Sequence, residues 1–159
     1  MIPAAKPFNQ SDALGRHLTD ILKTITVSNG YETDIGLRVF RGKLKHDEDL
    51  VPYSTLIEGE DRPTEQGLNE VVNQQQYAVG AYVACDPDNP NDAAHAAIRD
   101  IRRAIFKRGD GPARARLGNR VKEVRYLGKD IGPRADGRAI VFAVVHFEVT
   151  FVESLVGNA

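Results

Sequence analysis

The last long run of strand-forming residues constrains the fold more than any other segment of this chain. From Arg138 to Val152 the sequence is rich in β-branched and aromatic residues and has no glycine or proline, which is typical of a long strand. Side chains alternate across a sheet, so one face of this strand is apolar from end to end. The residues of that face are Val141, Ala143, Val145, Phe147, Val149 and Phe151. We expect this face to lie against helices.

The opposite face of the same strand is apolar only in its first half. Its residues are Ile140, Phe142 and Val144, followed by His146, Glu148 and Thr150. The chain contains two good helical patterns, and both are needed to cover the first face. The leftover apolar residues therefore predict contact with a second copy of the chain or with another protein, which suggests a part of an assembly.

Length and charge limit the remaining possibilities. A chain of 159 residues is expected to form a single domain, 1–159, with one core. Its 21 basic and 22 acidic residues give no global reason to expect polyanion binding. There is one cysteine, Cys85, and no apolar run approaches the roughly 20 residues of a membrane span. We expect a soluble protein made in a reducing compartment, without a membrane partner.

The other patterns predict an α+β domain. Two prolines place residues 1–10 in an extended lead-in, and apolar residues at helical spacing then predict a helix over about 11–29. Ser11 can cap its start, and Asn29-Gly30 can end it. The further predicted elements are strands at 35–40, 53–58, 75–85 and 120–126 and a helix at about 92–107, capped by Asn91 or Asp92. The order is α-β-β-β-α-β-β, with a mostly antiparallel sheet of about five strands and two helices packed on one face.

Two connections and one tail complete this prediction. The polar stretch 59–70 reads as a loop longer than a usual hairpin connection, and such loops tend to be functional. We expect it to project from the subunit and to become ordered on assembly. The stretch 128–137 is predicted to join the fourth strand to the last, which makes these two strands antiparallel neighbours. Residues 153–159 are predicted to form a short C-terminal tail.

No reactive constellation is visible in the sequence. The four histidines are far apart, and neither they nor Cys85 lie in a metal-binding or nucleophile spacing. The glycines at 109 and 111 follow a helical pattern instead of opening one, which is the wrong polarity for a phosphate site. We therefore expect no enzyme activity and no cofactor.

Charge is unevenly distributed along the chain. Between residues 99 and 125 there are ten basic residues against three acidic ones. This stretch is interpreted as a solvated helix face, as a surface for an acidic partner, or as a surface near DNA, although few aromatics accompany it. Acidic segments at 47–49, 58–61 and 86–92 offer the complementary surface that a head-to-tail ring needs. The charged candidate contact residues are Arg99, Arg102, Arg103, Arg114, Arg116, Arg120, Asp47, Glu48, Asp49, Glu60 and Asp61.

Several segments carry a resemblance to a known family. They are Asn-Gly-Tyr-Glu-Thr-Asp-Ile-Gly at 29–36, Ala-Val-Gly-Ala-Tyr-Val-Ala at 78–84, the helical pattern at 94–101, Val-Arg-Tyr-Leu-Gly-Lys-Asp-Ile at 124–131 and the closing strand at 143–151. In this layout the chain resembles the tail-terminator and minor tail proteins of long-tailed bacteriophages. The resemblance implies a small α+β subunit of the virion, assembled in the host cytoplasm, that forms a hexameric ring at the head-proximal end of the tail.

The same resemblance implies partners. The ring caps the tail tube, stops the addition of tube protein and presents the surface that the neck, or head-completion, protein joins, with sheath protein as a further candidate partner. DNA passes through the lumen without sequence-specific binding. Two alternatives remain open: a connector protein of the neck, and a small nucleic-acid-binding or enzymatic domain that uses the basic stretch.

Overall fold

The computed structural model describes residues 10–106, 121–132 and 137–157. The elements are α1 (Ser11–Leu22), η1 (Val27–Asn29), β1 (Val39–Arg41), η2 (Glu48–Leu50), β2 (Tyr53–Gln66), β3 (Glu70–Ala84), α2 (Pro90–Phe106), β4 (Val121–Ile131) and β5 (Ile140–Ser154). The α+β class and the order of helices and strands predicted from the sequence are confirmed.

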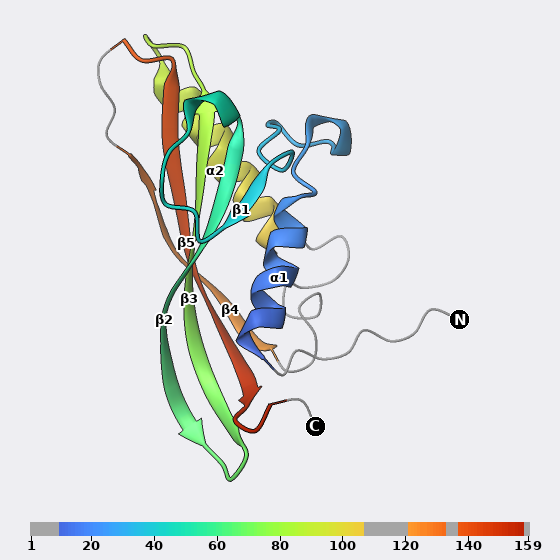
Figure 1. The fold of residues 1–159 in the computed structure, drawn as a ribbon. Coiled ribbons are helices and arrows are strands. Elements are labelled where there is room, and N and C mark those ends of the chain that lie inside the picture. Colours follow the sequence, from blue (N-terminus) through green and yellow to red (C-terminus); the bar gives the residue numbers. More distant parts are fainter. Residues whose placement is uncertain (1–9, 107–120, 133–136, 158–159) are drawn as a thin grey trace.

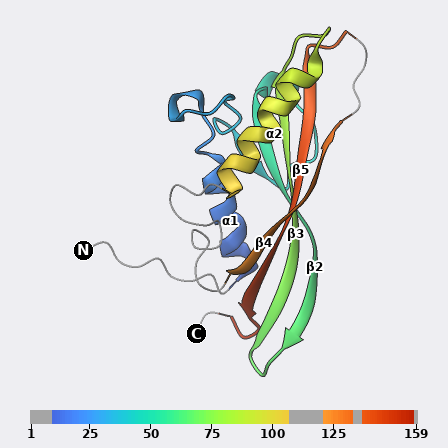
Figure 2. The same cartoon turned by 180° about the vertical axis from the view of Figure 1, so that it is seen from behind.

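The strands form one mixed sheet in the order β1-β2-β3-β5-β4. The β1–β2 pair is parallel, and the other three pairs are antiparallel. The prediction that the last two strands are antiparallel neighbours is therefore confirmed. Both helices lie on the same side of the sheet, as the two opposite views show (Figures 1 and 2).

The core lies between the helices and the face of β5 that the sequence predicts to be covered. All six of its residues, from Val141 to Phe151, are at most 1% exposed. The ring of Phe147 stacks on Tyr77 of β3, with 5.3 Å between the ring centroids. From α2, three alanines and three isoleucines are buried against this layer, and the small alanine side chains allow a helix to lie close to a sheet. The predicted inner face is thus confirmed.

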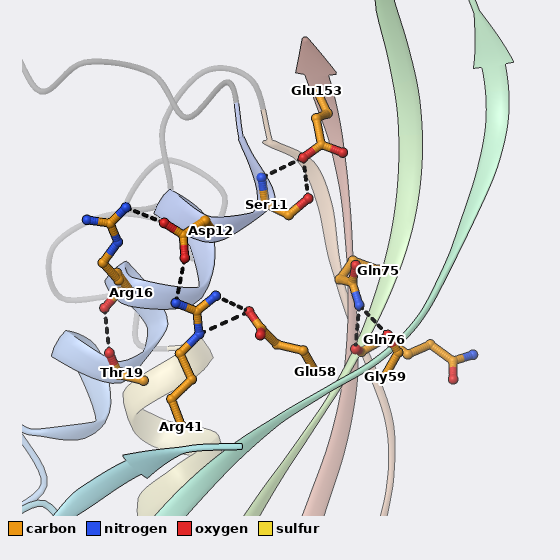
Figure 3. A network of polar contacts seen from close by, with 10 residues as sticks. All are labelled: Ser11, Asp12, Arg16, Thr19, Arg41, Glu58, Gly59, Gln75, Gln76 and Glu153. Carbon is orange, nitrogen blue, oxygen red and sulfur yellow. Dashed lines mark hydrogen bonds and ion pairs between the residues drawn. The ribbon is translucent and has the colours of Figure 1, made fainter. Parts of the chain in front are cut away.

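A polar network fastens α1 to the sheet (Figure 3). The Arg41 guanidinium on β1 donates to Asp12 at 2.8 Å and to Glu58 at 2.6 and 3.2 Å. Arg41, and after it Arg16, lowers the pKa of Asp12. At the start of the helix, the amide and hydroxyl of Ser11 donate to the Glu153 carboxylate of β5. The first turn of α1 is therefore bonded to β1 and β2 through Arg41, and to β5 through Glu153.

The first helix differs from the prediction at both ends. It ends at Leu22 instead of near 29, because the Thr24 hydroxyl donates to the Ile21 carbonyl and the chain turns away into η1. Gly30, at φ +88°, closes η1 and not α1. Ser11 is not the cap: Gln10 holds that position without a side-chain hydrogen bond. Ser11 is instead the first residue inside the helix.

The polar stretch 59–70 is not a loop. β2 continues to Gln66, the chain turns at 67–69, and β3 begins at Glu70. The register shifts between Glu58 and Asp61 and again between Pro63 and Glu65. Such bulges let a proline and several charges sit in an edge strand. The loop prediction was wrong because the outer half of β2 lies beyond β1, at the edge of the sheet. There both faces carry polar residues, so the sequence does not alternate between apolar and polar residues as a half-buried strand does.

Smaller corrections concern the other boundaries. The first strand is only Val39–Arg41, and Ile35 is buried in the preceding turn. Helix α2 begins at Pro90, a residue favoured at the first helical position, instead of after a cap at 91 or 92. β4 continues to Ile131, well into the predicted connection 128–137, and β5 includes the first two residues of the predicted tail at 153–159. Most of the predicted lead-in, residues 1–9, lies outside the described residues.

Candidate assembly interface

The face of the sheet opposite the helices is hollowed where β2, β3 and β5 lie side by side. Neither α1 nor α2 covers this face in the described part of the chain (Figures 1 and 2), whereas the loop 42–52 with the short η2 lies over one end of it, where His46 stacks on Tyr82. The hollow has a volume of about 120 Å³, and we call it the open-face groove. It is lined by Lys43, Leu44, Thr55, Ile57, Ala78, Gly80, Tyr82, Phe142 and Val144. Phe142 and Val144 are two of the three apolar residues for which the sequence predicts an intermolecular contact, and both are half-buried.

Small residues on β3 form the floor of this groove. Gly80 pairs with Val144, and Tyr82 pairs with Phe142. A Cβ atom placed on Gly80 would lie 2.7 Å from Cε2 of Phe142, so the Phe142 ring lies over the glycine. The same ring stacks on Tyr82 with centroids 4.5 Å apart. A larger residue at 80 would therefore displace Phe142, while the small side chain of the half-buried Ala78 leaves room beside that ring.

An aromatic row continues from the groove and holds its rim. The ring of His46 stacks on Tyr82 at 4.0 Å, and Tyr53 stacks on Tyr82 at 4.9 Å. The Tyr53 hydroxyl is 2.9 Å from Nδ1 of His46 and accepts a bond from the Asp47 amide at 3.1 Å. Burial raises the pKa of the Tyr53 and Tyr82 hydroxyls and lowers the pKa of His46.

The rim itself is part of the loop between β1 and η2. The Thr55 hydroxyl donates to the Lys43 carbonyl at 3.0 Å, which ties that loop to the sheet. Next to this anchor, Leu44 is 79% exposed. The groove is thus bordered by an apolar side chain that has lost little of its contact with solvent.

The polar half of the open face is satisfied within the sheet. Glu148 is only 3% exposed, and Arg125 on β4 donates to its carboxylate at 3.3 Å. One residue pair further along the strands, Nε2 of His146 lies 3.2 Å from the Asp130 carboxylate. The apolar side chains of this face that no other part of the described chain fully covers are therefore in the first half of β5, as the sequence predicts.

The basic residues of α2 act largely within the chain. Arg99 forms two hydrogen bonds with the Glu32 carboxylate, at 2.8 and 2.9 Å, which lower the pKa of Glu32. Arg103 donates to the Gly30 carbonyl at 2.8 Å and lies over the ring of Tyr31. Arg102 lies over the ring of Tyr126. The candidates Arg114, Arg116 and Arg120 lie outside the described residues.

The acidic candidates fall into two groups. In the first, Asp47 accepts a hydrogen bond from the Asp49 amide at the start of η2, and Glu48 forms an ion pair with Arg138. In the second, Glu60 and Asp61 lie on the exposed outer half of β2. The structure brings neither group together with the arginines of α2, whose partners are in the 30–33 turn and on β4. Ile140, the remaining apolar candidate, is half-buried at the start of β5, next to Phe142 on the same face.

The groove also contains residues that sequence reasoning did not single out. Ile57, Ala78, Gly80 and Tyr82 share its surface with the predicted residues of β5. The signal was present in the alternation of 75–85, where the face opposite Tyr77 and Val79 is also apolar. Only the pairing of β3 with β5 shows that these two half-apolar faces combine into one surface.

Among the described residues, no group of three or more His, Cys, Asp or Glu side chains is placed to hold a metal ion. Within the same residues, no helix is both long enough and apolar enough to cross a membrane.

Comparison with known proteins identifies no family for this chain. No protein-family model matches it, and no curated protein matches it. Among solved structures, it is similar to a chain of a structure described as the virion of a native gene transfer agent particle, with 10% sequence identity and a TM-score of 0.46. That similarity covers 74% of this chain and 81% of the other. At this identity and overlap, function has to be inferred from the residues of this chain.

Proposed function

We propose that this chain is a structural subunit of a phage-type virion and acts as a tail terminator. Copies of the subunit form a ring that caps the tail tube, stops further addition of tube protein and offers the surface to which the neck binds. The proposal is supported by the sequence resemblance to tail-terminator and minor tail proteins and by the chemistry of the uncovered sheet face. The hexameric number and the head-proximal position come from the resemblance alone.

The observation that carries the proposal is the open-face groove. Its apolar residues come from three strands and from Leu44 of the adjoining loop, and among the described residues neither α1 nor α2 lies over them. Burying apolar surface stabilises an association by about 25 cal/mol per Å² removed from water. A monomer gains nothing from keeping such a surface, whereas a subunit that meets a neighbour does.

Ring formation provides a physical means of ending a polymer. A head-to-tail contact that closes on itself leaves no free binding end in the plane of the ring. A closed ring of the same symmetry as the tube can therefore occupy the growing end without offering the site for another ring of tube protein. The neck protein, and sheath protein in tails that have one, would bind the outer surface. DNA would pass through the lumen without sequence-specific contacts.

A nucleic-acid-binding role is less well supported by these residues. Arg99 and Arg103 are bonded to the 30–33 turn of their own chain. Arg102 is half-buried and lies over Tyr126. A DNA-binding surface needs several cations directed at phosphates, and these three have intramolecular contacts instead.

The test is a tube-polymerisation assay with a matched pair of variants. Tube protein is polymerised with and without this protein, and tube lengths and ring masses are measured. We expect the wild type to stop growth and Val144→Lys to lose this activity, because a charge in the groove opposes burial. Thr150→Lys, on the same face of the same strand but in its polar half, should keep it.

Three outcomes would contradict the proposal. Tubes that grow equally long with the wild type would exclude a capping role. Stable binding to a neck complex without any effect on tube growth would favour the connector protein instead. Salt-sensitive DNA binding by the isolated protein would favour the nucleic-acid-binding alternative.

A further inference from the structure

A second exposed apolar surface lies at the far end of the β2–β3 hairpin. Leu68, in the turn between the two strands, is 93% exposed. The end of β5 lies beside this turn, because the Leu155 amide donates to the Asn69 carbonyl at 2.8 Å. Leu155 and Val156 are 50% and 66% exposed. We call Leu68, Leu155 and Val156 the hairpin-tip patch.

Within the described residues, no helix packs on this patch. The hairpin extends past the helix layer, so neither helix reaches the turn (Figures 1 and 2). The turn itself is closed by the backbone, with the Gly67 amide donating to the Glu70 carbonyl at 2.8 Å. A polar residue at 68 would serve this turn equally well. The patch is therefore available for a partner.

The groove suits an apolar side chain such as the one at the tip. Its volume of about 120 Å³ is well above the roughly 10–15 Å³ that one water molecule needs. Its walls include Ile57, Ala78, Phe142 and Val144. A leucine side chain can therefore enter the hollow beside the Phe142 ring.

The charges around the two surfaces are opposite. Lys43 and Lys45 flank the exposed Leu44 at the rim of the groove. Glu65 and Glu70 lie on either side of the hairpin turn and line a hollow there together with three valines. An approach of the tip to the groove brings carboxylates towards ammonium groups, which favours this pairing over tip against tip or groove against groove.

One copy cannot fill its own groove with its own tip. Ala78 lies nine positions after Asn69, which is about 30 Å along an extended strand. β3 is hydrogen-bonded to β2 on one side and to β5 on the other along this whole stretch, so it cannot fold back. The tip can reach only the groove of a second copy.

We propose that the hairpin-tip patch of one copy binds in the open-face groove of the next, with Leu68 seated over Ala78 beside the Phe142 ring. This inference rests on the proposed function, because it specifies how neighbours in the ring meet. The contact joins two different surfaces, so it is head-to-tail and propagates around a ring. The hairpin acts as a rigid arm that sets the distance between neighbours.

Complementation between two variants tests this contact. Leu68→Asp removes the tip, and Ala78→Leu fills the groove with the subunit's own side chain. Each variant alone should be unable to form rings, whereas their mixture should form one-to-one dimers, since one intact tip and one intact groove remain. Leu37→Asp, at a leucine that is 62% exposed elsewhere, should still form rings. Native mass spectrometry and sedimentation measure these species, and thermal melting checks that each variant is folded.

Disulfide trapping gives a second measurement that does not depend on a loss of assembly. In a Cys85→Ser background, Leu68→Cys combined with Ala78→Cys should form covalent dimers and larger species on oxidation. The control combines Leu68→Cys with Ala84→Cys, on the same face of the same strand but about 20 Å from Ala78, and should cross-link at least tenfold less. If the wild type is monomeric alone, trapping is performed on the tube-bound protein.

The outcomes separate this inference from the proposed function. Rings and capping that persist in Leu68→Asp, or equal cross-linking at 78 and 84, would overturn the tip-in-groove contact and leave the terminator role standing. Specific cross-linking at 78 by a protein that never affects tube growth would support the contact and contradict the terminator role. A mixture of the two variants that stays monomeric, while the wild type forms rings, also overturns the contact.

Discussion

Asp100 is the residue that gives the Asn29–Gly36 segment its place in the fold. It is 2% exposed on the inner side of α2, and its carboxylate accepts hydrogen bonds from the Glu32 amide and from the amide and hydroxyl of Thr33, at 2.7–3.1 Å. Three donors offset the cost of burying the charge. The segment quoted for the family resemblance therefore has a structural role, because it docks the turn after α1 onto α2.

We expect Asp100→Ala to lower the free energy of unfolding by about 1–3 kcal/mol for each donor that stays buried without a partner. Asp100→Asn should cost less, since one oxygen still accepts. Urea denaturation measures both. Asp88→Ala, at an exposed position in the turn before α2, should change stability by no more than about 0.5 kcal/mol. If Asp100→Ala unfolds at the same urea concentration as the wild type, the carboxylate does not hold the turn.

His46 makes stability depend on pH. Burial, and then the charge of Arg138, lowers its pKa below the usual 6.5, so the fold favours the neutral ring. Between the lowered value and 6.5 the unfolded chain binds more protons, so this contribution is fully present above pH 6.5 and is lost as the pH falls through the lowered value.

Replacing His46 with a non-titrating aromatic tests this effect. The difference in unfolding free energy between pH 7.5 and pH 5.5 should be smaller in His46→Phe than in the wild type. Leu37→Phe, at an exposed residue that does not titrate, should leave the difference unchanged. Carboxylates with lowered pKa values, such as Asp12 and Glu32, lose their contribution only at more acidic pH. An unchanged difference in His46→Phe would mean that the stacked ring takes up its proton alike in the folded and the unfolded chain.

At the scale of elements, the β2–β3 hairpin is the part that the sequence did not predict. Its inner strand reads Glu70-Val-Val-Asn-Gln-Gln-Gln76, yet Asn73 and Gln75 are at most 7% exposed on the helix side. The Gln75 amide donates to the Gly59 carbonyl across the bulge in β2 at 2.7 Å, and the Asn73 amide donates to Glu153. Polar side chains replace the expected apolar ones because their partners lie within the sheet.

The hairpin should therefore be ordered in the free subunit. Amide hydrogen exchange is expected to be slow through residues 71–76 of β3, which have a strand on each side. Along residues 60–66 of β2, protection should alternate, because every second amide points away from β3. The turn at 67–69 should exchange fastest. Uniformly rapid exchange from 59 to 76 would restore the prediction of a segment that becomes ordered only on assembly.

At the scale of the whole molecule, two exposed apolar surfaces lie on different parts of the sheet. The helices cover one face, and the groove and the hairpin-tip patch remain outside that cover. Association through these surfaces should be driven mainly by apolar burial. Lys45, Glu65 and Glu70 are exposed and Lys43 is half-buried, and ion pairs at such solvent-accessible positions contribute about 0.2–1 kcal/mol each.

Self-association should therefore show a negative heat-capacity change and a weak salt dependence. High salt should reduce the association constant by about tenfold at most. Lys43→Gln should reduce that salt dependence further without abolishing rings. Calorimetric dilution at several temperatures and sedimentation at several salt concentrations measure these quantities. Complete dissociation at moderate salt would mean that charge, and not apolar burial, holds the copies together.

By itself, the sequence determined the class of the fold, the order of its elements, the covered face of β5 and the apolar half of the opposite face. These follow from alternation and helical spacing, which depend only on neighbouring residues and on which side of an element meets water. Only the tertiary structure decided the length of the β2–β3 hairpin, the joining of Tyr82 and Ala78 to Phe142 and Val144, and the use of Arg99 and Arg103 inside the chain. Each of these depends on a strand register or on a contact between segments that are distant in the sequence. A strand with polar residues on both faces shows no hydrophobic periodicity, so its register cannot be predicted from the sequence.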